Sequence, residues 1–161
     1  MKRRENVIAA VFNRVLQLLA RFSPGPTTLR VWLHRWRGVR IGKRVWIGYD
    51  AIIETSYPYL VEIQNDAVVG IRATIIAHFR ESSGVAIEEG AFLGPGVIVM
   101  PNVRVGKGAV VTAGSVVTAS VAPMTLVQGN PARPVAKVGV MLDSNTSLKQ
   151  FMKHLKPLAR R

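Results

Sequence analysis

The stretch IEEGAF-LGPGVI-VMPNVR-VGKGAV-VTAGSV-VTASVA, residues 87–122, repeats every six residues and indicates the fold of the whole chain. Each unit begins with an aliphatic residue, and the fifth residue of each unit is small or β-branched. A period of six matches neither the 3.6 of a helix nor the strict alternation of a long strand, so it predicts very short strands separated by turns. Gly and Asn recur at the second to fourth positions, where turns need a permissive backbone.

The same phase continues upstream of this stretch. Residues 41–52 read IGKRVW-IGYDAI and residues 63–74 read IQNDAV-VGIRAT, so the repeat spans most of residues 41–122. Three units form one triangular coil of about 18 residues, and parallel hydrogen bonding stacks successive coils about 4.8 Å apart. The sequence therefore predicts an all-β fold, a parallel β-helix of four to five coils.

This pattern resembles the hexapeptide-repeat acyltransferase superfamily over residues 38–138. Residues 105–135, which end in GNPARPV, are similar to the C-terminal block of galactoside, maltose and surface-polysaccharide O-acetyltransferases. The resemblance implies a left-handed β-helix, a homotrimer and acetyl-CoA as co-substrate. It also implies O-acetylation of a carbohydrate or glycan precursor, as in polysaccharide biosynthesis.

Two interruptions of the repeat are the candidate functional loops, because a regular prism leaves only its loops and edges as free surface. Residues 54–62, ETSYPYLVE, separate Ile53 from Ile63 by ten positions instead of six. After Ile75, the position expected to be aliphatic is Glu81, so residues 78–84 are predicted to leave the coil as a loop.

His78 stands where this second loop departs and is the predicted catalytic residue. Acyl transfer from a thioester to a hydroxyl needs a base near neutral pH, which a histidine can supply. His78 is the only histidine inside the repeat, and the resemblance assigns the general base to a histidine in this setting, ATIIAHF. The alternative is an exposed histidine at the edge of a coil, and His34 and His154 are expected to be surface residues.

The remaining site predictions fall into three groups. Glu81, Glu54 or a loop carbonyl is expected to hold the imidazole tautomer. The predicted acceptor contacts are Glu54, Thr55, Ser56, Tyr57 and Glu81. For residues 54–57, a plain structural loop is an equal alternative. The coenzyme A contacts that the resemblance implies are Gly94, Ala113, Thr118 and Arg133.

Charge is concentrated at the two ends of the chain. The net charge is +13, yet residues 45–140 contain six basic and seven acidic side chains, whereas residues 1–44 contain 11 basic and one acidic. The predicted division is a basic amphipathic segment (1–40), the hexapeptide-repeat acyltransferase domain (41–138) and a basic tail or short helix (139–161), which is expected to break near Pro157. No nucleic-acid recognition motif accompanies the charge, so nucleic acid is not a predicted partner.

The N-terminal segment is predicted to form an amphipathic helix that ends at Ser23-Pro24-Gly25-Pro26. Its polar stripe contains Asn6, Asn13, Arg14, Gln17 and Arg21. These residues interrupt the apolar stretch too early for a membrane span, and no clean signal-cleavage site follows, so a cytoplasmic protein is expected. The helix is either a cap packed on its own domain or on a neighbouring subunit, or an anchor at a membrane surface. The tryptophans of residues 30–44 are expected either to cover the end of the core or to lie at an anionic interface.

The sequence is also compatible with other functions. A non-enzymatic trimeric scaffold, or a protein that contacts a membrane surface through its basic ends, would account for the charge. An antibiotic or an amino acid is an alternative acceptor. A three-histidine metal site of the γ-carbonic anhydrase kind does not fit a repeat with one histidine, and the absence of Cys excludes both an acyl-cysteine intermediate and thiolate ligands, so no metal is predicted.

Overall fold

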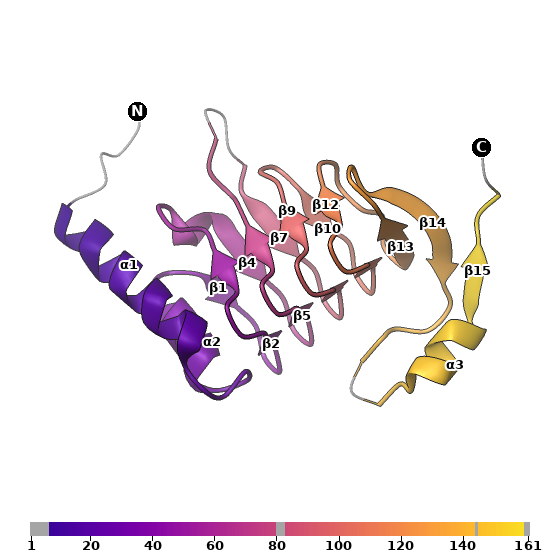
Figure 1. Ribbon diagram of the computed structural model, residues 1–161, viewed down its shortest axis with the longest axis horizontal. Helices are drawn as coiled ribbons and strands as arrows, with labels where there is room; N and C mark the ends of the chain where they lie inside the picture. Colours follow the sequence, from indigo (N-terminus) through magenta and orange to yellow (C-terminus); the bar gives the residue numbers. More distant parts are fainter. Residues whose placement is uncertain (1–6, 80–82, 144, 160–161) are drawn as a thin grey trace.

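A parallel β-helix forms the body of the protein in the computed structural model, which describes residues 7–79, 83–143 and 145–159 (Figure 1). Three faces surround its core, here called faces 1, 2 and 3. Face 1 contains β1 (Arg40–Ile41), β4 (Val61–Ile63), β7 (Val85–Ile87) and β10 (Arg104–Val105). Face 3 contains β3 (Ile52–Ile53), β6 (Thr74–Ile75), β9 (Ile98–Val99) and β12 (Val116–Val117). Face 2 contains β2 (Trp46–Ile47), β5 (Val68–Val69), β8 (Phe92–Leu93), β11 (Val110–Val111) and β13 (Thr125–Gln128), all parallel.

The register of these strands confirms the six-residue repeat. Phe92 pairs with Val110 and Ile98 with Val116, so partners in the regular coils stand 18 positions apart. Ile53 pairs with Ile75, which is 22 positions away, and Ile75 pairs with Val99, which is 24 away, because the two interruptions lengthen these coils. Both interruptions lie at the corner where face 3 leads into face 1, called the 3/1 corner below. The first contains the short 3-10 helix η1 (Pro58–Leu60).

Two columns of side chains fill the prism, as the repeat predicts. The aliphatic first positions from Ile47 to Val117 are at most 1% exposed. The fifth positions are also buried, and most of them are Ala or Val. Because every six-residue unit contributes the same two inward side chains, the core is a continuous stack along the prism rather than a single central cluster.

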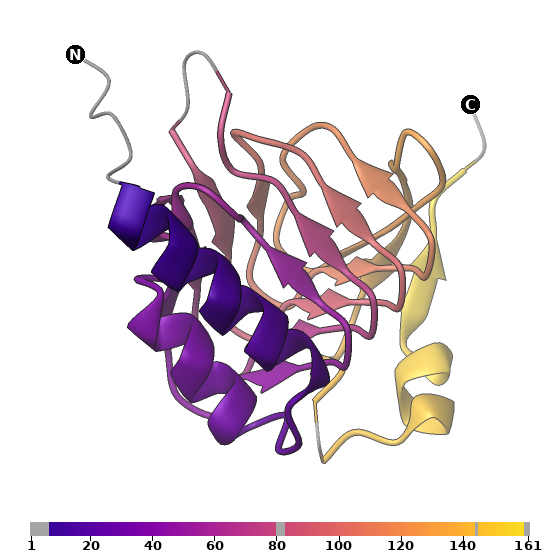
Figure 2. The same ribbon diagram turned by 60° about the vertical axis from the view of Figure 1, so that its left-hand side comes forward.

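Two helices close the N-terminal end of the prism: α1 (Val7–Phe22) and α2 (Leu29–Trp36) (Figures 1 and 2). Val31 of α2 joins the main core, whereas Trp32 and Trp36 are 47% and 55% exposed and stack on each other with ring centroids 3.7 Å apart. Of the two alternatives for the tryptophans of this segment, covering the end of the core is therefore wrong for Trp32 and Trp36.

The opposite end of the prism is closed by antiparallel strands and a short helix. β13 pairs with β14 (Arg133–Val138), and β14 pairs with β15 (Leu155–Pro157). The helix α3 (Leu148–Lys153) packs there through Phe151. The C-terminal helix thus ends at Lys153 and not near Pro157, because the chain continues as a strand. Within the described ranges, no helix is long and apolar enough to cross a membrane.

Candidate active site

The two interruptions of the repeat bring Glu54 and His78 together at the 3/1 corner. Glu54 directly follows β3, and Ile76 follows β6, the strand stacked on β3. The Glu54 backbone continues this stacking by donating a hydrogen bond to the Ile75 carbonyl at 2.8 Å. Two residues after Ile76, His78 leaves the coil above Glu54. Parallel stacking therefore makes neighbours of two residues that are 24 positions apart in the sequence.

The imidazole of His78 is held by the Glu54 carboxylate. His78 Nδ1 lies 2.8 Å from both Oε1 and Oε2 of Glu54. The Glu54 side chain is fully buried, whereas the His78 side chain is 46% exposed. Tyr57 also contacts the imidazole, with the two rings edge to face and their centroids 5.9 Å apart. One side of the histidine is therefore fixed and the other faces solvent.

Backbone N–H groups fix the Glu54 carboxylate as well. Oε1 accepts from the amides of Ser56 (2.8 Å) and Tyr57 (3.1 Å), and Oε2 accepts from those of Ala77 (2.7 Å) and His78 (3.0 Å). Burial alone would raise the pKa of Glu54, but the hydrogen bonds from Ser56, the His78 ring, Ala77 and Tyr57 outweigh burial and lower it. Glu54 is therefore ionised at neutral pH although it is buried.

This geometry determines which nitrogen of His78 can act as a base. An ionised carboxylate only accepts hydrogen bonds, so Nδ1 of His78 carries the hydrogen and donates it to Glu54. The lone pair of the neutral ring is then on Nε2. An imidazole held by an orienting carboxylate is an arrangement that can perform general-base chemistry. The backbone φ of Glu54 is +24°, an unfavourable value for a residue with a side chain, and such strain is concentrated at functional sites.

The structure separates the predicted acceptor contacts by exposure. Glu54 has no exposed side-chain surface with which to contact an acceptor, so it is the orienting residue rather than an acceptor contact. Thr55, Ser56 and Tyr57 are partly exposed, and the Tyr57 ring contacts His78. Glu81 lies outside the described residues.

A buried polar network beneath Glu54 was not predicted from the sequence. Arg37 donates hydrogen bonds to the Ile53 carbonyl (2.9 Å) and to the Glu54 carbonyl. It also bonds to Asn13 Oδ1 at 2.7 Å and to Gln17 Oε1. Burial lowers the pKa of Arg37 to about 10, while the charge of Glu54 opposes this shift, so Arg37 remains charged at neutral pH.

His34 belongs to the same network and corrects a prediction. It is completely buried and not a surface residue, and its Nδ1 lies 2.9 Å from an Arg37 guanidinium nitrogen. Burial and the charges of Arg37 and Arg30 lower the pKa of His34 to about 3, so it is neutral. The helical spacing of Asn13 and Gln17 was the available signal for this network, but sequence alone does not show that a polar stripe faces inward.

The residues that the resemblance links to coenzyme A lie on two corners. A side chain at Gly94 would place Cβ 2.7 Å from the Ala113 amide nitrogen, so these two residues stack closely at the corner between faces 2 and 3. Thr118 follows β12 at the 3/1 corner, two coils above the level of His78, or about 10 Å along the prism axis. The GNPAR loop, residues 129–133, packs on β12, because the Ala132 amide donates to the Val116 carbonyl at 2.8 Å. Arg133, the last residue of this loop, is exposed.

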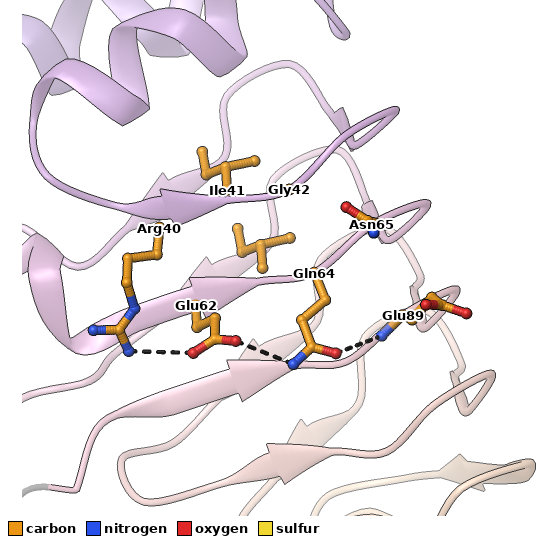
Figure 3. A pocket seen from close by; sticks show the side chains of 8 residues that line it. Arg40, Ile41, Gly42, Glu62, Gln64, Asn65 and Glu89 are labelled. Carbon is orange, nitrogen blue, oxygen red and sulfur yellow. Dashed lines mark hydrogen bonds and ion pairs between the residues drawn. The ribbon is translucent and has the colours of Figure 1, made fainter.

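Face 1 also has a shallow pocket (Figure 3). It lies at the edge opposite the 3/1 corner, because Gly42 and Gln64, which line it, directly follow β1 and β4. Its polar side chains bond to one another: Arg40 pairs with Glu62 at 3.2 Å, and Gln64 bonds to Glu62 at 3.0 Å. Gln64 also accepts a hydrogen bond from the Glu89 amide at 3.2 Å. Because these groups satisfy one another, the 3/1 corner remains the candidate active site.

Comparisons with known proteins agree with the fold. The family model described as bacterial transferase hexapeptide (six repeats) matches residues 84–119. No curated protein sequence matches the chain. The fold is thus that of the hexapeptide-repeat transferases, and the matched segment contains the 3/1 corner above His78.

Solved structures of acetyltransferases have the same fold. A hexapeptide-repeat-containing acetyltransferase from Vibrio cholerae matches with 21% identity and a TM-score of 0.65, over 84% of this chain and 93% of that one. A galactoside acetyltransferase in complex with coenzyme A matches with 18% identity and a TM-score of 0.59, over 81% of each chain. The serine acetyltransferase of Neisseria gonorrhoeae matches with 23% identity and a TM-score of 0.57, over 81% of this chain and 53% of that one.

Proposed function

We propose that the protein is an acetyl-CoA-dependent O-acetyltransferase in which His78 is the general base. The observation that carries the proposal is the His78–Glu54 pair at the 3/1 corner of a hexapeptide-repeat β-helix. A carbohydrate or glycan precursor is the proposed acceptor, and a homotrimer in the cytoplasm is the proposed form of the enzyme. Gly94, Ala113, Thr118 and Arg133 are the proposed contacts of coenzyme A.

The reaction needs one base and no covalent enzyme intermediate. His78 Nε2 removes the proton of the acceptor hydroxyl as its oxygen attacks the thioester carbonyl carbon. Glu54 stabilises the imidazolium that forms. The tetrahedral intermediate then collapses, the carbon–sulfur bond breaks, and the leaving thiolate takes the proton from His78. The products are the acetyl ester and free coenzyme A, and no Cys is present to form an acyl-enzyme.

Release of free thiol from acetyl-CoA, measured with a panel of sugars, glycan precursors and serine, tests this function. His78→Ala is expected to lower kcat roughly 10²- to 10⁴-fold, the usual contribution of a general base. His154→Ala changes an exposed histidine at the far end of the prism and is the matched control. Full turnover by His78→Ala would refute the proposed base, whereas activity with serine alone would change the acceptor and keep the base.

A further inference from the structure

The helix α1 faces outward with its apolar side. Eight large apolar side chains are between 49% and 78% exposed: Val7, Ile8, Val11, Phe12, Val15, Leu18, Leu19 and Phe22. The buried residues of the same helix include Asn13 and Gln17, with Ala10, Leu16 and Ala20. In Figure 2, α1 lies at the front, and no other described element of the chain passes in front of it. We call the eight exposed residues the α1 apolar face.

The open end of the β-helix explains this orientation. Backbone amides of each coil donate to carbonyls of the next coil, so carbonyls on the N-terminal rim of the first coil have no coil beneath them. Side chains of the helices supply the missing donors. Asn13 donates to Thr55 O (2.7 Å) and Gln17 to Ala51 O (3.1 Å). Because an unpaired buried carbonyl is costly, the side of α1 that contains Asn13 and Gln17 has to face the prism.

Arginines of α2 and its end complete this rim and account for part of the basic charge. Arg30 donates to Ile47 O at 2.6 Å, Arg37 to Ile53 O at 2.9 Å, and Arg35 to Ile41 O at 3.2 Å. These three arginines attach the N-terminal helices to the first coil of the prism. The α1 apolar face is therefore not needed to attach the helix, and it remains available to another partner.

We propose that the α1 apolar face docks on an anionic phospholipid bilayer. A helix at a bilayer surface buries its apolar side at the level of the headgroups and turns its polar side away, and α1 turns its polar side to the prism. Of the 11 basic side chains in residues 1–44, three bond to the rim, and the other eight, against one acidic residue, give charge complementarity to anionic lipid. At the same end of the molecule, α2 exposes the stacked pair Trp32 and Trp36, a residue type enriched at membrane interfaces.

Docking in this way would bring the candidate active site to the bilayer. Asn13, on the buried side of α1, bonds to the carbonyl of Thr55, the residue that follows Glu54. Lipid-linked hydroxyl acceptors would then meet His78 at the membrane surface. This last consequence rests on the proposed function, whereas the docking itself does not.

Vesicle sedimentation tests the proposal with the full chain. Vesicles of equal parts phosphatidylglycerol and phosphatidylcholine are compared with pure phosphatidylcholine. Phe12→Ser/Leu19→Ser is expected to lower partition onto the anionic vesicles by at least about tenfold, because two large apolar side chains no longer enter the lipid. Leu148→Ser/Met152→Ser, at the opposite end of the prism, is the matched control, since both residues are exposed to a similar degree. His78→Ala should bind as the unaltered chain does, which separates docking from catalysis.

Four results would overturn the proposal. These are absence of vesicle binding by the unaltered chain, equal binding of the two vesicle types, equal partition of Phe12→Ser/Leu19→Ser and the unaltered chain, and an equal loss in the Leu148 and Met152 control. Light scattering without vesicles provides a further check. If Phe12→Ser/Leu19→Ser changes the oligomer mass, the α1 apolar face is a contact between copies of the chain, and the bilayer is excluded as its occupant.

Discussion

Replacing Glu54 by glutamine keeps the shape of the side chain but removes its charge and one of its two acceptor oxygens. The variant therefore tests whether the carboxylate orients His78. The carboxylate accepts four backbone N–H groups and the His78 ring, and all four amides need an oxygen opposite them. Glutamine presents one oxygen and one NH2 group. Whichever way the amide turns, two backbone amides of the four face an N–H donor and lose their acceptor.

The expected cost follows from these contacts. Each buried donor left without an acceptor costs about 1–3 kcal/mol, so Glu54→Gln should lower the free energy of unfolding by about 2–6 kcal/mol. The glutamine NH2 would also favour the His78 tautomer with the lone pair on Nδ1, which removes the base from Nε2. We therefore expect kcat to fall roughly 10²- to 10⁴-fold while KM for acetyl-CoA stays within a few-fold.

The assay is thiol release with a responsive acceptor, together with urea unfolding, at a temperature at which the variant is still folded. Glu62→Gln is the matched control, because this glutamate is partly exposed on face 1 and bonds to the side chains of Arg40 and Gln64 there. A folded Glu54→Gln protein with unchanged kcat would refute the view that the carboxylate orients the base. An unchanged free energy of unfolding would refute the hydrogen-bond argument.

Two further predictions concern stability. The pKa of His34 is about 3 in the folded chain and near 6.5 in the unfolded chain. Between these pH values the unfolded state therefore binds more protons than the folded state. The free energy of unfolding should fall as pH drops below about 6.5, by up to about 1.4 kcal/mol per pH unit. His34→Gln should flatten this dependence in urea melts from pH 7 to about pH 5, whereas His154→Gln, an exposed site, should not; an unchanged slope in His34→Gln would contradict the assignment. Gly94→Ala should lower the free energy of unfolding by about 3 kcal/mol, because the added Cβ would press on the Ala113 backbone. Gly114→Ala should lower it by about 1 kcal/mol, because this Cβ would meet no atom within 4 Å and only the φ of +69° is unfavourable. Equal losses in the two variants would refute this steric argument.

The repeat could be predicted from the sequence because each strand obeys one local rule. Every inward position of the unit is aliphatic or small, so the period, the core and the position of both interruptions follow from the order of residues alone. The stacking that pairs Glu54 with His78 depends on how many residues each interruption adds. Those numbers can be counted, but the path of each loop cannot, so Glu54 and Glu81 remained alternatives for holding the histidine until the structure placed Glu54.

The N-terminal helices show why amphipathicity can be assigned to the wrong side. The polar stripe of a helix normally faces water, because water readily satisfies the hydrogen bonds of its side chains. At the end of a β-helix the balance differs, since the rim of the first coil offers carbonyls that water cannot reach once the end is covered. Asn13, Gln17 and Arg37 therefore stabilise the fold more by bonding to these carbonyls than they would by facing water. The hydrophobic pattern of α1 predicts a helix correctly, but the acceptors that determine its orientation belong to residues 51–55, far along the sequence.

The rim of the first coil also connects the two N-terminal helices to the candidate active site. Arg37 bonds to the backbone carbonyls of Ile53 and Glu54, and it is itself fixed by Asn13 and Gln17 of α1. Hydrogen bonds therefore connect α1 to the backbone that carries Glu54, and the Glu54 carboxylate in turn holds His78. The basic N-terminal segment has two separable parts in this view. Its inward arginines complete the first coil and support the candidate site, while the outward apolar face of α1 provides the surface through which we propose the protein is held at a membrane.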